Sequence, residues 1–164
     1  AEMLRHYIGN TGSKYTLNFK DLISEWSTAR NYRAKAMNDL MRVVEISATT
    51  SNKTIKTVEP IACSVNESSD CGWSIGSYST SISCTYKKKG NSYIAVIEYE
   101  LHDAYDWDRT VTSMGHLPVS PHEMWELHHG GYAKNYEVYG KNTFTLTWTS
   151  GQTFTSEGVM TNEE

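Results

Sequence analysis

The sequence lacks the features that mark several functional classes. Its 15 lysine and arginine residues against 19 aspartate and glutamate residues give a formal net charge of −4, which argues against a nucleic-acid partner bound chiefly through its phosphates. No apolar run approaches the ~18 residues that a membrane-spanning helix needs. The sequence contains no Cys or His pair at the usual C-x₂₋₄-C spacing of zinc ligands, no G-x-S-x-G elbow and no catalytic-cysteine signature. With 38% hydrophobic and 21% charged residues, residues 1–164 have the composition of a single folded domain.

Cysteine is scarce and odd in number, since only Cys63, Cys71 and Cys84 occur. At most one disulfide can therefore form within the chain. Cys63 and Cys71 flank a polar stretch typical of a hairpin loop, and a bridge across it would suit an oxidising compartment. The sequence supports equally well the alternative that all three cysteines are separate buried thiols. The first seven residues lack the basic-then-apolar pattern of a signal peptide, so either a signal has been removed or the chain is a fragment of a longer one. We expect the C-terminal part of a longer secreted protein.

Among the aromatic residues phenylalanine is rare, with three residues against eleven tyrosines and five tryptophans. Most aromatic rings therefore carry a polar group, which is typical of surfaces where one end of a ring packs and the other forms hydrogen bonds. Together with abundant serine and threonine and only three prolines, this composition favours an exported, β-rich protein.

The hydrophobic pattern predicts an α+β fold. Apolar residues at helical spacing indicate one helical face from Phe19 to Trp26 and a second through Tyr32, Ala36, Leu40 and Val43–Val44. β-Rich segments follow at Thr54–Cys63, Trp73–Tyr86, Ser92–Tyr105 and Phe144–Trp148. We expect N-terminal helices packed on a curved antiparallel sheet.

One further helix is predicted between the strands. Ser120, Pro121 and Glu123 form the pattern of a capping box with proline at the first helical position. Gly130 and Gly131 end the helix, which is therefore inserted before the last strands.

The densest group of reactive side chains lies at the end of a long predicted strand. Asp103, Asp106 and Asp108 fall within six residues, and Arg109 follows them. Strand alternation places Asp103 and Tyr105 on the apolar face and Asp106 on the other. Such a group suits a hard divalent cation or acid–base catalysis, whereas a polar turn that caps the strand is the competing interpretation.

Three segments resemble the C-terminal toxin domain of colicin M. They are His6-Tyr7-Ile8 with the Gly/Asn turn after it, Asp103-Ala104-Tyr105-Asp106, and Lys134–Gly140, which is similar to the family's G-K-x-Y-x-I strand. The second segment matches the family's Asp-x-Tyr-Asp motif position for position. The resemblance is distant and covers residues 3–16 and 98–140. A His-Arg pair that follows the motif in the family has no counterpart in this sequence.

This resemblance implies an antibacterial toxin that hydrolyses lipid II, the undecaprenyl-linked peptidoglycan precursor, between the lipid and the pyrophosphate. The toxin would be secreted, act at the membrane surface outside the cytoplasmic membrane of the target bacterium, and be neutralised by a cognate immunity protein. It also implies dependence on a divalent cation, for which we expect Mg²⁺ or Ca²⁺.

Carried onto this sequence, the resemblance implies three sets of residues. The metal ligands are Asp103, Asp106 and Asp108. The catalytic residues are Asp103, Tyr105, Asp106, Arg109 and His116. In these sets one carboxylate activates water, and Arg109 or His116 stabilises the departing phosphate. Trp107 is the expected substrate-binding residue.

Two other functions remain open from the sequence. Small nuclease toxins use His, Asp and Arg without an obvious motif, and incubation with nucleic acid and metal would identify one. A non-enzymatic carbohydrate-binding module would suit the many tyrosines and tryptophans, and its binding should not change on mutation of Asp103 and Asp106.

Overall fold

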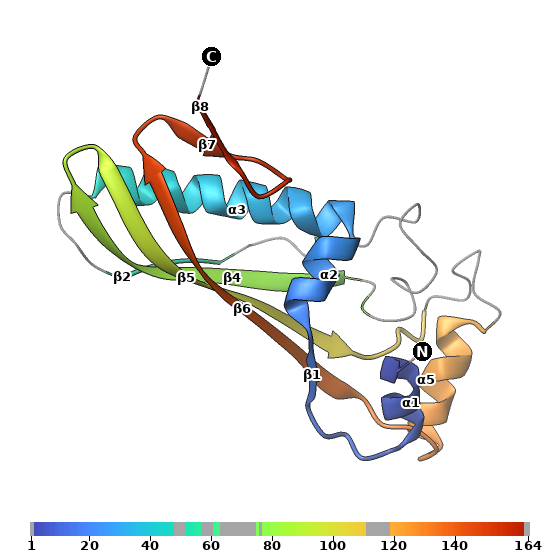
Figure 1. Ribbon diagram of the computed structural model, residues 1–164. Coiled ribbons are helices and arrows are strands. Elements are labelled where there is room, and N and C mark those ends of the chain that lie inside the picture. Colours follow the sequence, from blue (N-terminus) through green and yellow to red (C-terminus); the bar gives the residue numbers. More distant parts are fainter. Residues whose placement is uncertain are drawn as a thin grey trace. The chain divides into compact units, whose positions relative to one another are not determined.

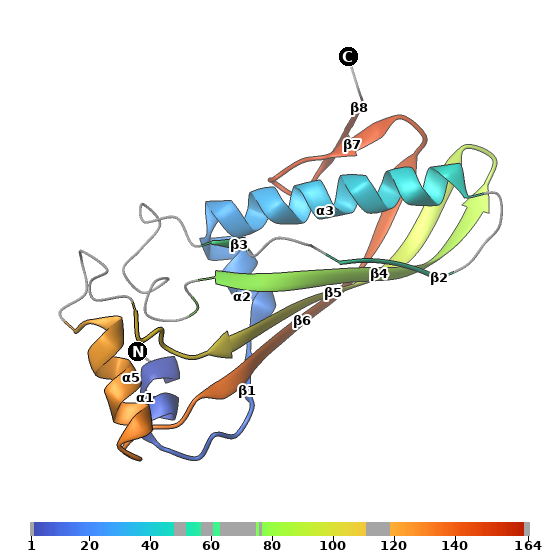
Figure 2. The same cartoon turned by 180° about the vertical axis from the view of Figure 1, so that it is seen from behind.

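The computed structural model describes residues 2–47, 52–56, 61–62, 75, 77–110 and 119–162 (Figures 1 and 2). They form an α+β structure, as the sequence predicts. The elements in chain order are α1 (Glu2–Ile8), β1 (Tyr15–Leu17), α2 (Phe19–Glu25), α3 (Ser27–Ile46), β2 (Asn52–Lys56), β3 (Ile61–Ala62), β4 (Ser77–Lys89), β5 (Ser92–Tyr105), α5 (Pro121–His129), β6 (Tyr136–Thr149), β7 (Gln152–Phe154) and β8 (Met160–Asn162). Among these helices, none is both long and apolar enough to cross a membrane.

The strands form two sheets. The larger has the order β1-β6-β5-β4-β2, with β3 also paired to β4, and the smaller pairs β7 with β8. β2 runs antiparallel to β4, with Asn52 opposite Thr85. β4 and β5 form a hairpin whose two-residue turn is Gly90-Asn91, and the positive φ of 60° at Gly90 is a conformation that glycine adopts without strain. The insertion of α5 between β5 and β6 confirms the predicted position of the late helix.

The chain divides into two compact units. The first unit comprises Ala1–Leu17, Ala62–Tyr78 and His102–Tyr139, and the second comprises Asn18–Ile61, Ser79–Leu101 and Gly140–Glu164. Cys84 lies buried in β4, whereas Cys63 and Cys71, and with them the predicted bridge, lie outside the described residues.

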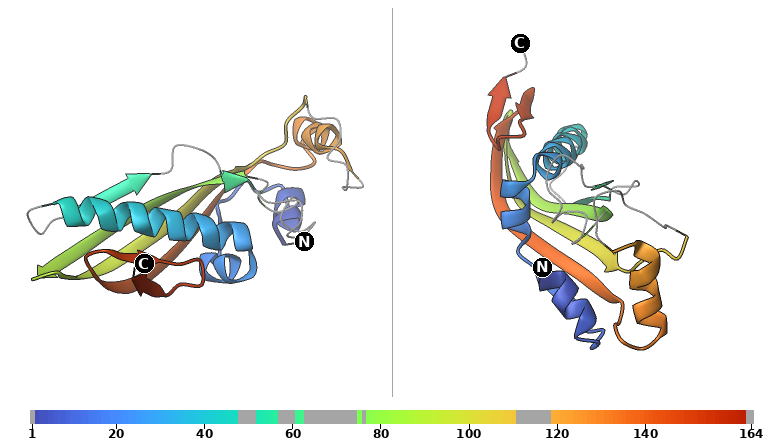
Figure 3. Two further views of the ribbon diagram at one scale, coloured as in Figure 1. Left: turned by 90° about the horizontal axis from the view of Figure 1, so that it is seen from above. Right: turned by 90° about the vertical axis from the view of Figure 1, so that its right-hand side faces the viewer.

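The helices of the second unit begin and end where the apolar pattern changes. Asn18 caps α2 by accepting a hydrogen bond from the Asp21 amide, and Trp26, in an extended conformation, separates α2 from α3. α3 lies on one face of the strands of this unit (Figure 3). The buried residues of α3 are Ala29, Ala36, Met37, Leu40, Met41 and Val44.

Two residues predicted on the buried face of α3 are instead exposed. Tyr32 is 37% exposed and Val43 is 40% exposed. Met37 and Met41 take the corresponding places in the core, since flexible methionine side chains fill irregular gaps. The helix was therefore predicted correctly, but its buried face was predicted partly wrong.

The core of the second unit includes a tryptophan near the end of β6. The Trp148 ring stacks on Tyr93 with centroids 5.0 Å apart, and its indole N–H donates to Glu45 Oε1 of α3 at 2.9 Å. Packing and a satisfied indole N–H thus join the helix to the sheet. The predicted strand at Phe144–Trp148 is the second half of the longer β6.

Asn38 of α3 holds the edge of β7 by two hydrogen bonds. Its amide nitrogen donates to the Phe154 carbonyl at 2.9 Å, and its amide oxygen accepts from the Phe154 backbone N–H at 2.8 Å. We expect Asn38→Ala to lower the free energy of unfolding by about 2 kcal/mol, because both backbone groups lose a partner beside the buried Phe154 ring. Asn38→Asp retains the acceptor and should lose less. An unchanged urea midpoint for Asn38→Ala would contradict this account.

In the first unit, α1 and α5 lie next to each other (Figures 1 and 2). The fully buried Tyr7 of α1 donates its hydroxyl proton to the Met124 carbonyl of α5 at 2.8 Å, and the Lys134 amide donates to the Tyr7 carbonyl. The predicted capping box is present, with the Ser120 hydroxyl accepting from the Glu123 amide and the Glu123 carboxylate accepting from the Ser120 amide. The end of β5 lies in this unit with the two helices.

Candidate active site

Asp103 is the central carboxylate of the candidate site. It lies near the end of β5, is half-buried, and its Oδ2 atom is buried without a hydrogen-bond partner. Burial raises the pKa of Asp103 from 3.8 to about 7; the Ala104 backbone amide opposes this rise and the nearby Asp106 charge adds to it. A carboxyl group with a pKa near neutrality can both accept and donate a proton under physiological conditions.

Three tyrosine rings, those of Tyr7, Tyr105 and Tyr136, pack together near Asp103 and are called the aromatic wall. The Tyr105 ring is 4% exposed and stacks on Tyr136 with centroids 4.9 Å apart and planes at 9°. The Tyr7 ring lies 5.5 Å from Tyr105, and the half-buried Trp107 ring packs edge-on against it at 5.8 Å. Tyr136 in turn donates its hydroxyl proton to the Met3 carbonyl at 2.7 Å. These contacts fix the end of β5 against β6 and α1.

The tyrosine hydroxyls remain protonated in this environment. Burial, with a contribution from the Asp106 charge, raises the pKa of Tyr7 to about 12. Burial also raises the pKa of Tyr105 and Tyr136 well above the usual range, and the Asp103 charge adds to the rise at Tyr136. The tyrosines therefore act as neutral donors and packing groups, and Asp103 is the titratable member of this cluster near pH 7.

Asp106 and Asp108 occupy different environments. Asp106 is exposed, and its backbone amide donates to the Ala104 carbonyl at 3.0 Å, which turns the chain as it leaves β5. Its charge nevertheless raises the pKa of both Asp103 and Tyr7. Asp108 accepts from the backbone amide and the hydroxyl of Thr110, both at 2.7 Å, and these bonds lower its pKa. Asp103 and Asp106 thus interact, while Asp108 makes the contacts of a polar turn.

The candidate metal ligands are these carboxylates. No group of three His, Cys, Asp or Glu side chains suited to holding a metal occurs within the described residues. The chemistry of Asp103 and Asp106 fits a hard cation, because the buried Oδ2 of Asp103 lacks a donor and Mg²⁺ is commonly held by one or two carboxylates together with water and substrate phosphates.

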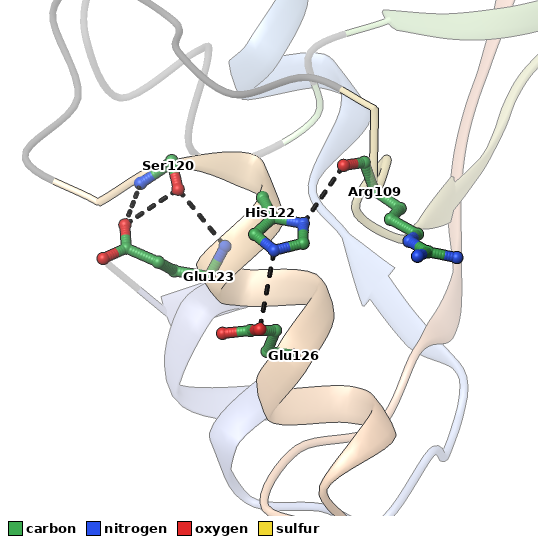
Figure 4. Close-up of polar contacts among 5 residues, drawn as sticks. All are labelled: Arg109, Ser120, His122, Glu123 and Glu126. Atoms are coloured by element: carbon green, nitrogen blue, oxygen red, sulfur yellow. Dashed lines mark hydrogen bonds and ion pairs between the residues drawn. The ribbon is translucent and has the colours of Figure 1, made fainter.

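Arg109, three residues beyond Asp106, contacts α5 (Figure 4). The Arg109 guanidinium lies over the Trp125 ring, 5.2 Å from its centroid. His122 Nδ1 is 3.1 Å from the Arg109 carbonyl oxygen, and its Nε2 is 3.5 Å from Glu126 Oε1. The predicted catalytic residue His116 lies outside the described residues.

Sequence reasoning missed three residues of this site. Tyr7 and Tyr136 both fall in segments that resemble the colicin M domain, yet neither was predicted to pack on Tyr105. His122 was not among the predicted site residues, and its capping-box context was the available signal that it lies on the first turn of α5. Its contact with Arg109 depends on tertiary structure and has no local signature.

Comparison with solved structures identifies a bacteriocin as a protein of similar fold. The TM-score is 0.50 at 13% sequence identity, and the match covers 90% of this chain and 51% of the other. That protein is the bacteriocin syringacin M from Pseudomonas syringae pv. tomato DC3000. The chain therefore spans about half the length of the bacteriocin.

At this identity the likeness shows the fold, and it supports at that level the predicted resemblance to a bacteriocin toxin domain. No protein-family model matches the sequence, and no curated protein matches it.

Proposed function

We propose that this chain is an antibacterial toxin domain that hydrolyses lipid II between the undecaprenyl lipid and the pyrophosphate. The observation that carries the proposal is Asp103, a half-buried carboxyl group with a pKa of about 7 beside Asp106. The Asp-x-Tyr-Asp pattern in which both residues lie, and the bacteriocin fold of the chain, support the same function.

In the proposed reaction, a water oxygen bonds to the phosphorus that carries the lipid, and the bond from that phosphorus to the lipid oxygen breaks. The attacking water must lose a proton and the lipid oxygen must gain one. The Asp103 carboxylate is suited to orienting this water or accepting its proton, and a cation bound beside it would favour this ionised form. Arg109 is suited to binding the charged phosphates, since a guanidinium presents several donors to phosphate oxygens.

A divalent cation, when bound, would neutralise phosphate charge. Asp103 and Asp106 are the residues that would hold it, with Asp108 as the further ligand implied by the sequence. The remaining parts of the proposal are secretion, action outside the cytoplasmic membrane of a target bacterium, and neutralisation by an immunity protein.

The experiment is thin-layer chromatography of labelled lipid II after incubation with the domain, with and without EDTA. We expect Asp103→Asn and Asp106→Asn each to slow cleavage at least about 100-fold, because each removes a group required for proton transfer or phosphate binding. Glu137→Gln, which changes an exposed carboxylate on β6, is the matched control and should cleave at the wild-type rate.

Three outcomes bear on separate parts of the proposal. Intact lipid II after incubation with the wild-type domain would contradict the reaction. Cleavage that persists in EDTA would contradict the metal requirement but leave the hydrolysis standing. If both aspartate variants cleave lipid II at the wild-type rate, neither Asp103 nor Asp106 takes part in the reaction.

A further inference from the structure

His122 is placed where it can hold Arg109 from two sides. The capping box fixes the first turn of α5, so the imidazole projects from a defined backbone position beside the segment that follows β5 (Figure 4). Because the Ser120 and Glu123 side chains already bond to the backbone amides at this helix start, an approaching anion finds those amides occupied. The group at this place suited to binding a phosphate is therefore the Arg109 side chain.

The first contact is with the backbone of Arg109. His122 Nδ1 lies 3.1 Å from the Arg109 carbonyl oxygen. A carbonyl oxygen only accepts hydrogen bonds, so Nδ1 carries the proton and donates it. Nε2 lies 3.5 Å from Glu126 Oε1, an i,i+4 contact that attracts the ring only when Nε2 carries a proton as well.

The second contact is with the platform beneath the Arg109 side chain. The His122 ring stacks nearly parallel to Trp125, with planes at 13° and centroids 6.0 Å apart. His129 stacks on the same indole at 4.0 Å, and the Arg109 guanidinium lies over that indole at 5.2 Å. His122 therefore orders both the main chain of Arg109 and the surface on which its cation rests.

Such an anchor is needed because Arg109 lies beyond the end of β5. The chain leaves the strand through a turn at Asp106 and a second turn closed by Asp108 and Thr110. The Arg109 backbone thus sits three residues from the Asp106 carboxylate without a ladder of strand hydrogen bonds to hold it.

We propose that His122 is a positioning residue: it holds Arg109, the pyrophosphate-binding cation, chiefly through the Nδ1 hydrogen bond, and the Trp125 stack is a secondary contact. This inference rests on the proposed function for the identity of the phosphate-bearing substrate. His122 acts through Arg109 and need not exchange a proton with the substrate.

The test uses two substitutions that each imitate one imidazole nitrogen. The amide nitrogen of His122→Asn reaches the position of Nδ1 and can still donate to the Arg109 carbonyl, whereas that of His122→Gln reaches the position of Nε2. We expect His122→Gln and His122→Ala to lower kcat/KM for lipid II at least about tenfold, mainly through a higher KM, because a displaced phosphate-binding group weakens substrate binding. His122→Asn should recover most of that loss.

A second readout does not depend on catalysis. Side-chain protons of Arg109 over the Trp125 ring should show upfield ring-current shifts by NMR, and titration with inorganic pyrophosphate should perturb the Arg109 guanidinium signals. His122→Asn should retain the shifts and the binding, and His122→Gln and His122→Ala should lose both. Arg109→Ala should not bind pyrophosphate with wild-type affinity.

The two readouts separate the possible failures. If wild-type protein binds pyrophosphate through Arg109 but leaves lipid II intact, the proposed function is wrong and the positioning role stands. If His122→Gln retains the Arg109 shifts and wild-type pyrophosphate binding, the positioning role is wrong whatever the lipid II result. If His122→Asn is as inactive as His122→Ala while its Arg109 signals match the wild type, His122 has a direct chemical role and the inference fails.

Discussion

Asp103→Asn should make the protein more stable than the wild type at pH 8 while abolishing its activity. The folded-state pKa of Asp103 is about 7, above its ordinary 3.8. The contribution of this group to stability is therefore fully present below about pH 4 and is lost as the pH rises to 7, because the unfolded chain ionises first. Asparagine does not ionise and escapes this loss.

The expected difference at pH 8 is at most about 4 kcal/mol, since each pH unit between the two pKa values corresponds to about 1.4 kcal/mol. Partial exposure of Asp103 reduces it. Urea unfolding of the two proteins at several pH values measures the difference, which should shrink steadily from pH 7 to pH 4. Glu137→Gln, which changes an exposed carboxylate on β6, is the matched control. If Asp103→Asn is less stable than the wild type at pH 8, burial of the ionised Asp103 carboxylate does not destabilise the folded protein.

The same variant reports on the cation. A divalent cation held by Asp103 should stabilise the wild-type protein at pH 8, where it offsets the charge of the buried carboxylate. It should not stabilise Asp103→Asn to the same extent. Equal stabilisation of both proteins by Mg²⁺ and Ca²⁺ would place the ion elsewhere.

Tyr105→Ala should be among the most destabilising single changes in the first unit. Its ring is almost fully buried, with Tyr136 stacked on it at 4.9 Å and Tyr7 at 5.5 Å. Removal of a buried aromatic ring costs about 3–5 kcal/mol through lost burial and the cavity left behind. We therefore expect a large fall in the urea midpoint and, because the end of β5 is no longer fixed, loss of lipid II cleavage.

Tyr105→Phe is the matched control for this change, since it keeps the ring and its stacking contacts. It should retain most of the stability that Tyr105→Ala loses. Comparison of their cleavage rates separates the packing role of the ring from any role of the hydroxyl group. If Tyr105→Ala unfolds at the wild-type urea concentration, the aromatic wall does not hold the site together.

The parts of the fold that follow from local pattern were predicted well. β5 has the predicted bounds Ser92–Tyr105, and its alternation correctly places Tyr105 inside and Asp106 outside. The α5 capping box was likewise predictable from the sequence, because its donors and acceptors lie within four residues of one another. The turn at Asp108 shows the contacts of the competing interpretation, whereas burial and the Asp106 charge raise the pKa of Asp103.

The environment of the site could not be predicted in the same way. The stacking of Tyr105 on Tyr136 depends on the register between β5 and β6, which no single-strand pattern specifies. The pKa of Asp103 depends on how many atoms cover it, and the contact of His122 with Arg109 depends on where α5 packs. Each of these arises from segments that approach each other only in the folded chain.

The hydrogen bond from Tyr136 to the Met3 carbonyl has a consequence for shortened versions of this chain. Residues near the start of the chain supply both the acceptor for Tyr136, 133 positions away, and the Tyr7 ring beside Tyr105, 98 positions away. Removal of α1 would leave the acidic motif without these contacts. A shortened version of the chain therefore keeps the end of β5 packed only if the first helix is retained.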